Sequence, residues 1–363
     1  MRGPVPDVFP FPGPLRGRPV ALMTTTPTRA LSPVLDTGRT MVGPALRDAV
    51  GSHLAPELGR IAQYHFGWAD AEGRPTGSWG GKMVRPALAL LSARAAGGAA
   101  ADGLPAAVAM ELVHNFSLLH DDIMDGDETR RGRATAWTVF GVPNAILAGD
   151  AMVTAATSIL LAAPGAGARS ATTSLMTATQ RMIDGQTSDV EFERRDDVTL
   201  TECVRMAGNK TGALLGCACS LGADLVGAQR ALIERLDAFG EHIGLAFQLV
   251  DDLLGIWGDP ERTGKQVGAD LRVRKKSLPV VAALNAPGTD ELRALYLSPE
   301  PLAERDVQRV TDLVERAGGR DWAQDEAARQ IAAAEECLVA AGIPDDVHGE
   351  FREVAGFIVG RQL

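Results

Sequence analysis

The spacing of apolar residues is the feature that most constrains how this chain folds. From Met41 onward they recur every three or four residues, and the alternating runs typical of strands are scarce. Alanine and leucine, which both favour helix, are abundant. Because helices this apolar must bury their faces on one another, the sequence predicts an all-α fold, a single-domain antiparallel helical bundle. The candidate helices cover residues 42–68, 82–97, 104–124, 144–162, 168–188, 199–224, 229–257, 275–285, 304–317, 322–341 and 347–360.

Residues 1–40 have a different composition. Prolines recur throughout them, and such density prevents a helix and leaves little to bury. We therefore expect a disordered Pro-rich extension at 1–40, followed by one domain at 41–363. No uninterrupted apolar stretch typical of a signal peptide occurs there. A docking or targeting tail with an unknown partner is the alternative, and Met23 is a candidate for the true start.

The charge balance narrows the classes of function. Asp and Glu number 46 against 36 Lys and Arg, a formal net charge of −10, whereas nucleic-acid binders usually carry a basic excess. We therefore expect no nucleic-acid partner, and the acidic balance suits a protein that collects divalent cations. The four cysteines form no disulfide or zinc pattern, which favours the cytoplasm. No run of 18 apolar residues exists, so no transmembrane helix is expected.

The most informative segment joins an apolar helix to a group of aspartates. Residues 111–132 read ELVHNFSLLHDDIMDGDETRRG. Asp121 and Asp125 are four residues apart and share a helix face, with Asp122 beside them. Unneutralised, these carboxylates would repel one another. A hard cation such as Mg²⁺ resolves this, and it prefers one or two carboxylates plus phosphate oxygens and water.

Two arginines follow this cluster directly. Arg130 and Arg131 carry guanidinium groups, which suit multidentate contacts to phosphate. The plain alternative is an exposed acidic helix end followed by a basic turn. That alternative fits poorly, because the aspartates end an apolar helix that should be buried. A diphosphate held through magnesium is therefore the expected ligand.

A second acidic pair, Asp251-Asp252, lies in the segment FQLVDDLLG, again on an apolar helix. Two such clusters facing one another across a bundle would hold a metal–diphosphate group between them. Counter-charge could come from three lysines at the rim: Lys210, Lys265 and Lys275. Lys82 and Arg85 follow two glycines and could form a separate phosphate pocket, because glycines beside a helix start let phosphate approach backbone N–H groups.

With these motifs, the sequence resembles the trans-isoprenyl diphosphate synthase family, the farnesyl and geranylgeranyl diphosphate synthases. The similarity covers about residues 80–279 and rests on motifs in the family's order. These are GGKMVRP at 80–86, DDIMD at 121–125, RRG at 130–132, Gly185-Gln186 with Asp189, Lys210-Thr211, Phe247-Gln248 with Asp251-Asp252, Gly258-Asp259, Thr263-Gly264-Lys265, and Lys275. The resemblance implies an isoprenoid-synthase bundle with a central active-site cavity, which condenses isopentenyl diphosphate with an allylic diphosphate.

The resemblance also implies roles for individual residues. Up to three Mg²⁺ ions would be bound by Asp121, Asp122, Asp125, Asp251 and Asp252. The allylic diphosphate would contact Arg130, Lys210 and Lys265, with Lys275 close by. Isopentenyl diphosphate would be held by Lys82, Arg85, His114 and Arg131. Gln186, Thr211 and Gln248 would line the reacting centre. The departing diphosphate can accept the proton that is lost, so no dedicated enzyme base is needed.

One departure from the family pattern stands in the second acidic motif, where Gly255 replaces a third aspartate. We expect activity to be retained, with Asp259 compensating in part or a third metal ion bound less tightly. A non-catalytic subunit of a heteromeric synthase is an alternative, although loss of the first motif would be its signature and that motif is intact.

The depth of the product tunnel is the last prediction from the sequence. Phe116 and Ser117 lie about 6–7.5 Å deeper along the helix than Asp121. A bulky Phe116 would floor the tunnel, as in geranylgeranyl synthases of the archaeal type, whereas ordinary core packing is the alternative. We expect a C20 product, then C15, then longer chains. A class I terpene cyclase is a further alternative, but it would have no use for Lys82 and Arg85. The resemblance suggests a homodimer.

Overall fold

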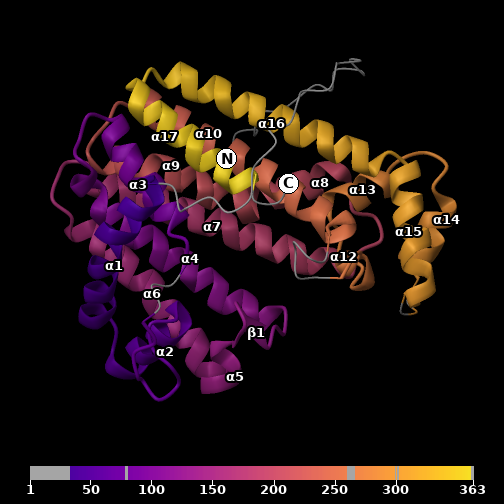
Figure 1. Ribbon diagram of the computed structural model, residues 1–363, viewed down its shortest axis with the longest axis horizontal. Helices are drawn as coiled ribbons and strands as arrows, with labels where there is room; N and C mark the ends of the chain where they lie inside the picture. Colours follow the sequence, from indigo (N-terminus) through magenta and orange to yellow (C-terminus); the bar gives the residue numbers. More distant parts are fainter. Residues whose placement is uncertain (1–32, 78–80, 260–265, 299, 301, 361–363) are drawn as a thin grey trace, which may run out of the picture. The chain divides into compact units, whose positions relative to one another are not determined.

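The long apolar segments form helices that pack on one another, so the all-α prediction is confirmed (Figure 1). Ser32–Leu363 form one compact unit, as expected of a single domain. The computed structural model describes residues 33–77, 81–259, 266–298, 300 and 302–360.

The helices are α1 (Pro33–His53), α2 (Pro56–Phe66), α3 (Val84–Ala95), α4 (Leu104–Met124), α5 (Ala136–Phe140), α6 (Val142–Ala162), α7 (Ala168–Phe192), α8 (Leu200–Ala207), α9 (Ala213–Leu225), α10 (Arg230–Trp257), α12 (Ala269–Arg272), α13 (Leu278–Leu284), α14 (Asp290–Tyr296), α15 (Glu304–Arg316), α16 (Gly319–Ala341) and α17 (Asp345–Val359). Two shorter helical segments are η1 (Ala100–Gly103), a 3-10 turn, and η2 (Gly208–Gly212), a π-helical turn. Strands β1 (Thr129–Arg130) and β2 (Arg133–Ala134) pair antiparallel.

Helix α4 lies in the centre of the core. Pro105 stands in its first turn, where the missing N–H costs no hydrogen bond. Its sequence is apolar nearly all round, and most residues from Ala106 to Leu119 are buried against α3, α6, α7 and α9. A helix with this pattern is a core helix. Its last turn carries Asp121 and Asp122 to the edge of the core.

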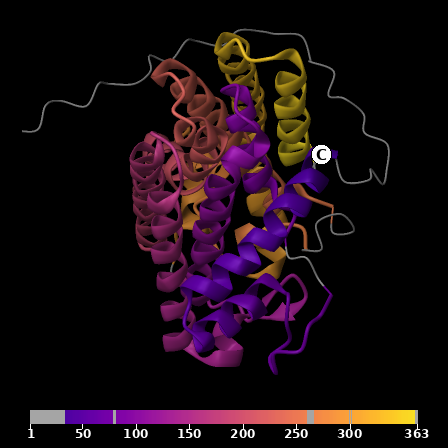
Figure 2. The same cartoon turned by 90° about the vertical axis from the view of Figure 1, so that its left-hand side faces the viewer.

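Close helix crossings position the second half of the bundle. A Cβ atom at Gly222 of α9 would lie 2.0 Å from the carbonyl oxygen of Ala89 in α3, so only glycine fits there. The hydroxyl of Ser92 accepts hydrogen bonds from the N–H groups of Gly222 and Ala223 at 2.9 and 3.2 Å. Helix α10 packs on α9 and α16, and α17, yellow in Figure 2, returns to α3 and α10.

A smaller hydrophobic cluster lies beside the end of α10. Ile256 and Leu271 are fully buried in it, together with Tyr296 and apolar residues of α13 and α15. The hydroxyl of Tyr296 donates to the carbonyl oxygen of Lys275 at 2.9 Å. This cluster fixes α12 and the segment that carries Lys275.

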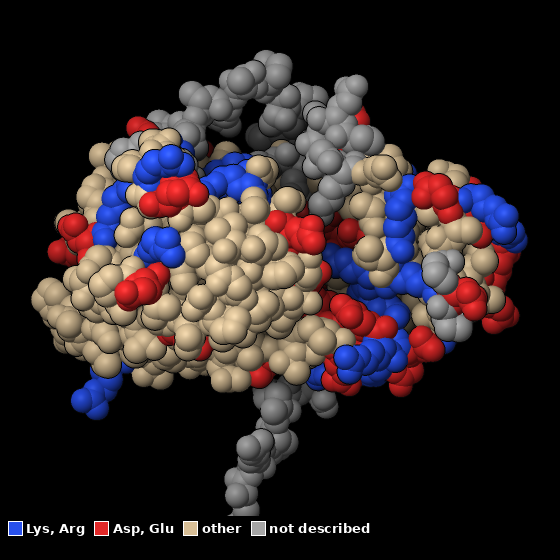
Figure 3. Space-filling view, turned by 90° about the horizontal axis from the view of Figure 1, so that it is seen from below, with Lys and Arg blue, Asp and Glu red and all other residues tan. Residues whose placement is uncertain are grey.

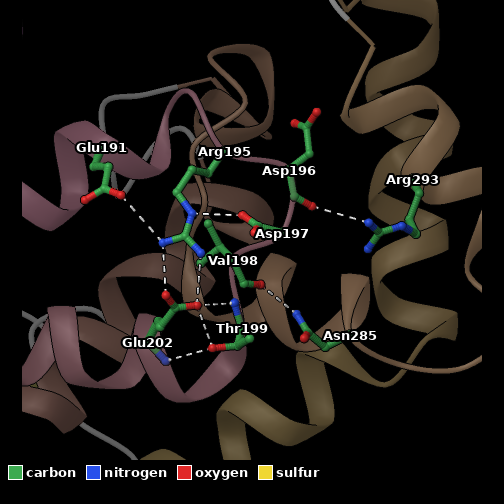
Figure 4. A network of polar contacts seen from close by, with 9 residues as sticks. All are labelled: Glu191, Arg195, Asp196, Asp197, Val198, Thr199, Glu202, Asn285 and Arg293. Carbon is green, nitrogen blue, oxygen red and sulfur yellow. Dashed lines mark hydrogen bonds and ion pairs between the residues drawn. The ribbon is translucent and has the colours of Figure 1, made fainter.

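The junction between α7 and α8 is a network of paired charges (Figure 4). Arg195 pairs with Glu202 at 2.9 Å and with Asp197 at 2.8 Å. Thr199 caps α8 by accepting from the N–H of Glu202, and the Glu202 carboxylate accepts in return from the Thr199 N–H at 2.9 Å. Asn285 donates to the carbonyl oxygen of Val198 at 3.0 Å, which ties the junction to the end of α13.

Several predicted boundaries were wrong. The expected helix at 42–68 is two helices, because Pro56 ends α1 and begins α2. Residues 33–40, assigned to the disordered extension, belong to α1, since proline is tolerated in a first helical turn. The rest of that extension lies outside the described residues. The expected helix at 199–224 is interrupted by η2, and the β1–β2 hairpin, α5 and α14 were not anticipated.

Helix α6 bears on the expectation that no transmembrane helix exists. In the described ranges it alone is long and apolar enough, by length and composition, to cross a membrane. The expectation counted unbroken apolar runs, whereas α6 reaches a high mean hydropathy despite Asp150 and several hydroxyl residues. Its residues Ala145, Ala148 and Met152 are fully buried, and α6 packs against α4, as a core helix of the bundle does.

Candidate active site

The last turn of α4 presents a group of carboxylates. Asp121 and Asp122 lie in this turn, and Asp125 follows as its C-cap, where its N–H donates to the carbonyl oxygen of Asp121 at 2.8 Å. Gly126, with a φ of 68°, then turns the chain away. The structure therefore brings together the three aspartates that the sequence grouped.

These carboxylates carry charge that the protein neutralises only in part. Burial raises the pKa of Asp121 from 3.8 to about 6, while Lys210 opposes the shift and Asp125 adds to it. Burial also raises the pKa values of Asp122 and Asp125, and neighbouring aspartates add to both shifts. A group with these shifts favours a bound cation.

The β1–β2 hairpin places two consecutive arginines in different surroundings. Nε of Arg130 donates to Oδ1 of Asp122 at 2.6 Å. Arg131 adopts a left-handed φ of 54°, and its guanidinium lies 3.3 Å from where a Cβ of Gly81 would stand. The charge of Glu111 also acts on Arg131. Arg130 thus belongs to the aspartate group, and Arg131 belongs to a second pocket.

The second pocket is the cluster of cationic side chains around Arg85 of α3, which is half-buried. Arg85 lies 3.3 Å from Nε2 of His114 on α4. Because a guanidinium can only donate, Nε2 accepts and the ring proton lies on Nδ1. Burial lowers the pKa of His114 well below its ordinary value, with Arg85 and Arg131 adding to the shift, so the ring is neutral at pH 7. Glu111, held by Asn115 at 2.9 Å, supplies the negative charge beneath the arginines.

The second acidic pair lies on α10, and its two aspartates have different surroundings. Asp252 is buried, and its Oδ1 accepts from Nε2 of Gln248 at 2.9 Å and from Lys275 at 3.2 Å. Its Oδ2 accepts from the N–H of Leu278 at 2.9 Å. Gln248 in turn accepts from the hydroxyl of Thr211 at 2.9 Å. Asp252 is therefore saturated with hydrogen bonds, whereas Asp251 is half-buried beside it.

Lys210 connects the two acidic groups. It lies in the π-helical turn η2, and its ammonium contacts Oδ2 of Asp189 at 2.5 Å. The charge of Lys210 acts on Asp121 and Asp125, and that of Asp189 acts on Asp125 and Lys275. The Lys210–Asp189 pair therefore lies within electrostatic range of the aspartates at the end of α4 and of Lys275 beside α10.

A glycine of α7 makes this position of Lys210 possible. A Cβ at Gly185 would stand 2.3 Å from the backbone nitrogen of Lys210, so no larger residue fits between α7 and η2. The neighbouring Gln186 is buried, and its Oε1 accepts no hydrogen bond among the described residues. Such an orphaned acceptor awaits a ligand.

Three other residues were predicted to belong to the site. Lys82 is exposed, and its ammonium lies 5.9 Å from the ring centroid of Phe357 in α17. Phe116 is buried, edge-on to His120 at 4.7 Å between ring centroids, and faces Gly149 of α6. Lys265 lies outside the described residues.

The donor set fits magnesium. Oδ2 of Asp122 is buried and accepts no hydrogen bond among the described residues. The nearby acidic side chains are carboxylates, so the atoms that they offer to a metal ion are oxygens. Within the described ranges, no three His, Cys, Asp or Glu side chains come close enough to enclose an ion by themselves. Magnesium needs no such enclosure, because it binds one or two carboxylates together with phosphate oxygens and water.

Sequence reasoning missed two residues of this site. Asp189 was noted only as part of a motif, yet it joins Lys210 to both acidic groups. Glu111 was quoted without a role, although it lies one helical turn before His114 and is buried beneath Arg85. The spacing of one helical turn between Glu111 and His114 could have indicated a role for Glu111 in the site. No spacing links Asp189 to Lys210.

In Figure 3 the blue and red side chains gather in a hollow beside a broad area that lacks Lys, Arg, Asp and Glu. One face of the molecule thus combines a charged recess with an uncharged surface.

Comparisons with known proteins agree with this geometry. Residues 75–314 match the family model described as polyprenyl synthetase. From Mycobacterium tuberculosis, a (2E,6E)-farnesyl diphosphate synthase is 44% identical over 92% of this chain and 94% of its own length, and a geranylgeranyl diphosphate synthase is 45% identical over 90% and 93%. The crystal structure of a polyprenyl synthetase from Streptomyces coelicolor A3(2) is 51% identical, with a TM-score of 0.85, and covers 91% of this chain and 100% of that one.

Two acidic groups joined through Lys210, a separate arginine pocket, and these similarities lead to one assignment. The chain belongs to the polyprenyl synthetase family and is a short-chain trans-prenyl diphosphate synthase.

Proposed function

We propose that the enzyme condenses isopentenyl diphosphate head to tail with an allylic diphosphate and makes C20 geranylgeranyl diphosphate as its main product. The observation that carries the reaction is the Lys210–Asp189 ion pair, whose charges act both on the aspartates of α4 and on Lys275 beside the second acidic group. That arrangement suits a diphosphate held between α4 and α10.

The acidic groups form the allylic subsite in this proposal. Asp121, Asp122, Asp125 and Asp251 hold up to three Mg²⁺ ions. Asp252, saturated by Gln248, Lys275 and Leu278, orients the second group. Bound magnesium supplies positive charge that stabilises the leaving diphosphate. Arg130, Lys210, Lys265 and Lys275 add cationic contacts to the same diphosphate.

Isopentenyl diphosphate occupies the second pocket. Arg85 and Arg131 face its diphosphate, with Lys82 at the exposed edge. Neutral His114 can turn its ring N–H to the same group without adding charge. The charge of Glu111 partly balances that of the two arginines.

The reaction then needs few further groups. The alkene of isopentenyl diphosphate attacks C1 of the allylic substrate as the C1–O bond breaks. The proton lost afterwards goes to the departing diphosphate. Thr211, Gln248 and the orphaned acceptor of Gln186 line this centre and orient the reactants. The surrounding apolar helices exclude water, which would quench the cation.

We propose that Phe116 sets the product length. It is buried one helical turn deeper than the aspartates and packs between His120 and α6. Removing its ring would extend the tunnel, so Phe116→Ala is expected to shift the main product beyond C20. An unchanged product distribution would remove Phe116 as the floor.

We also propose that the enzyme works in the cytoplasm as a homodimer. Large apolar side chains are exposed along α6 and α7, namely Val142, Ile146, Leu147, Leu161, Ile183 and Val190. Such a surface is typical of a subunit interface. Light scattering coupled to gel filtration should give the dimer mass, and Leu147→Glu should give the monomer.

The decisive assay supplies labelled isopentenyl diphosphate with C5, C10 or C15 allylic diphosphate and Mg²⁺, and identifies the lipid. Condensation to C20 supports the proposal, and arrest at C15 or extension past C20 changes the product assignment. Hydrocarbon from a single substrate would indicate a class I terpene cyclase. No product from any pair would indicate a non-catalytic subunit.

A further inference from the structure

The two acidic groups of this chain differ by one carboxylate. The first has aspartates at 121, 122 and 125, whereas the second has Asp251, Asp252 and then Gly255. Position 255 follows Asp251 by four residues, as 125 follows 121, so the two positions correspond on their helices. A glycine inside a helix costs about 1 kcal/mol relative to alanine, so it calls for a reason.

The structure supplies that reason. A Cβ at Gly255 would lie 2.2 Å from Oδ2 of Asp270 and 2.4 Å from its Cγ. The carboxylate of Asp270 therefore occupies the space into which a side chain at 255 would project. We infer that Asp270 supplies the second acidic group with the carboxylate that position 255 lacks, and helps hold a divalent cation there together with Asp251.

Asp270 is firmly placed for this role. It lies on α12, whose next residue, Leu271, is fully buried in the smaller hydrophobic cluster. The N–H of Gly268 donates to the carbonyl oxygen of Ile256 at 3.1 Å, which ties the start of α12 to the end of α10. On the outer side of α12, Arg272 pairs with Glu304. These anchors hold the carboxylate against α10.

Lys275 lies among the carboxylates of this second group. The ammonium of Lys275 lies 3.2 Å from Asp252 and 3.6 Å from Asp270. The same lysine also feels the charge of Asp251. Asp252 already accepts three hydrogen bonds. Asp251 and Asp270 add carboxylate oxygens to the group, the kind of ligand atom that Mg²⁺ prefers.

The inference rests on the proposed function, and an exchange of the carboxylate between the two positions tests it. Binding of Mg²⁺ with inorganic diphosphate is measured by titration calorimetry and thermal shift, without turnover. Asp270→Ala should weaken this binding about 10- to 100-fold, the range for groups that tune a metal site. Gly255→Asp alone should also weaken it, because two carboxylates then compete for one space. The double variant Gly255→Asp/Asp270→Ala should bind within about threefold of wild type.

Control measurements distinguish failure of the role inferred for Asp270 from failure of the proposed function. Asp312→Asn removes an exposed charge of α15 outside the site and should leave binding unchanged, while circular dichroism verifies the fold of each variant. Wild-type binding by Asp270→Ala, or a double variant no better than Asp270→Ala, would overturn the role of Asp270 alone. Absence of Mg²⁺-dependent diphosphate binding in the wild type would instead overturn the proposed function.

Discussion

The α7–α8 junction and the end of α4 contain similar residues and treat them in opposite ways. At the junction, Arg195 and Thr199 lower the pKa of Glu202 to about 2, and Arg195 also lowers the pKa of Asp197. At the end of α4, burial raises the pKa of Asp121 to about 6 and that of Asp125 as well. The junction stabilises its carboxylates in the charged form, whereas burial at the site disfavours that form.

The difference identifies which region is built for stability and which for binding. Carboxylates that accept hydrogen bonds from a paired arginine stabilise the folded chain. Carboxylates that are buried close together destabilise it, and such a group persists when a ligand needs it. Charge alone does not separate the two regions, because arginines and aspartates adjoin in both.

The largest expected effect lies at the site. Asp121→Asn should lower kcat/KM for condensation about 10²- to 10³-fold, because it removes a charge that supports the leaving diphosphate. Asp48→Asn, an exposed aspartate of α1, is the matched control and should retain full activity. Comparable activity in the two variants would mean that the end of α4 is not the reaction site.

The comparison is sharpened by removing one cationic side chain from the site and one from the α7–α8 junction. Lys210→Met should lower activity about 10²-fold, since Lys210 joins both acidic groups. Arg195→Met should leave activity within about threefold while lowering the urea midpoint, because its partners stabilise only the junction. Equal losses of activity would show that the junction also shapes the site.

The stability of the metal-free protein should depend on Asp121 in a definite direction. Between pH 3.8 and about 6 the folded state binds more protons at Asp121 than the unfolded state, so stability falls as the pH rises. Above about pH 6 the penalty is complete, about 1–3 kcal/mol. Asp121→Asn should therefore unfold at higher urea than wild type at pH 7.5, and the gap should close by pH 4. A gap independent of pH would refute this origin.

A smaller change is expected from the helix cap. Thr199→Ala removes the hydroxyl that accepts from the N–H of Glu202 and should cost about 1 kcal/mol of unfolding free energy, with activity retained. Thr201→Ala, an exposed neighbour in α8, controls for the change in composition. Equal stability of the two variants would show that the cap contributes nothing.

The smallest effect should have the opposite pH dependence to that of Asp121. The pKa of Glu202 is lowered from 4.5 to about 2, so its stabilising contribution is complete above pH 4.5 and disappears as the pH falls toward 2. Glu202→Gln should be less stable than wild type at pH 7, with a gap that narrows below pH 4.5. Urea denaturation at several pH values measures both gaps, and parallel trends for Asp121 and Glu202 would contradict the comparison.

Much of the fold could be predicted from the sequence because helical periodicity is local. The helix expected at 104–124 is found at those residues, and the acidic pairs lie on the helices foreseen for them. The break at Pro56 and the π-helical turn at Lys210 were missed, since neighbouring residues on both sides favour helix. The roles that the resemblance implies for Arg130 and Arg131 stay predictions, and the position of Glu111 near Arg85 was not foreseen.

The sequence by itself determined the helices, the residue types of the site and their order along the chain, because these follow from spacing and chemical identity. Only the tertiary structure decided which charges are neutralised. Lys210 meets Asp189 because Gly185 lets two helices approach, and Asp270 fills the space beside Gly255 because α12 is anchored there. Such pairings join residues distant in sequence, and burial, which sets their pKa values, exists only once the helices have packed.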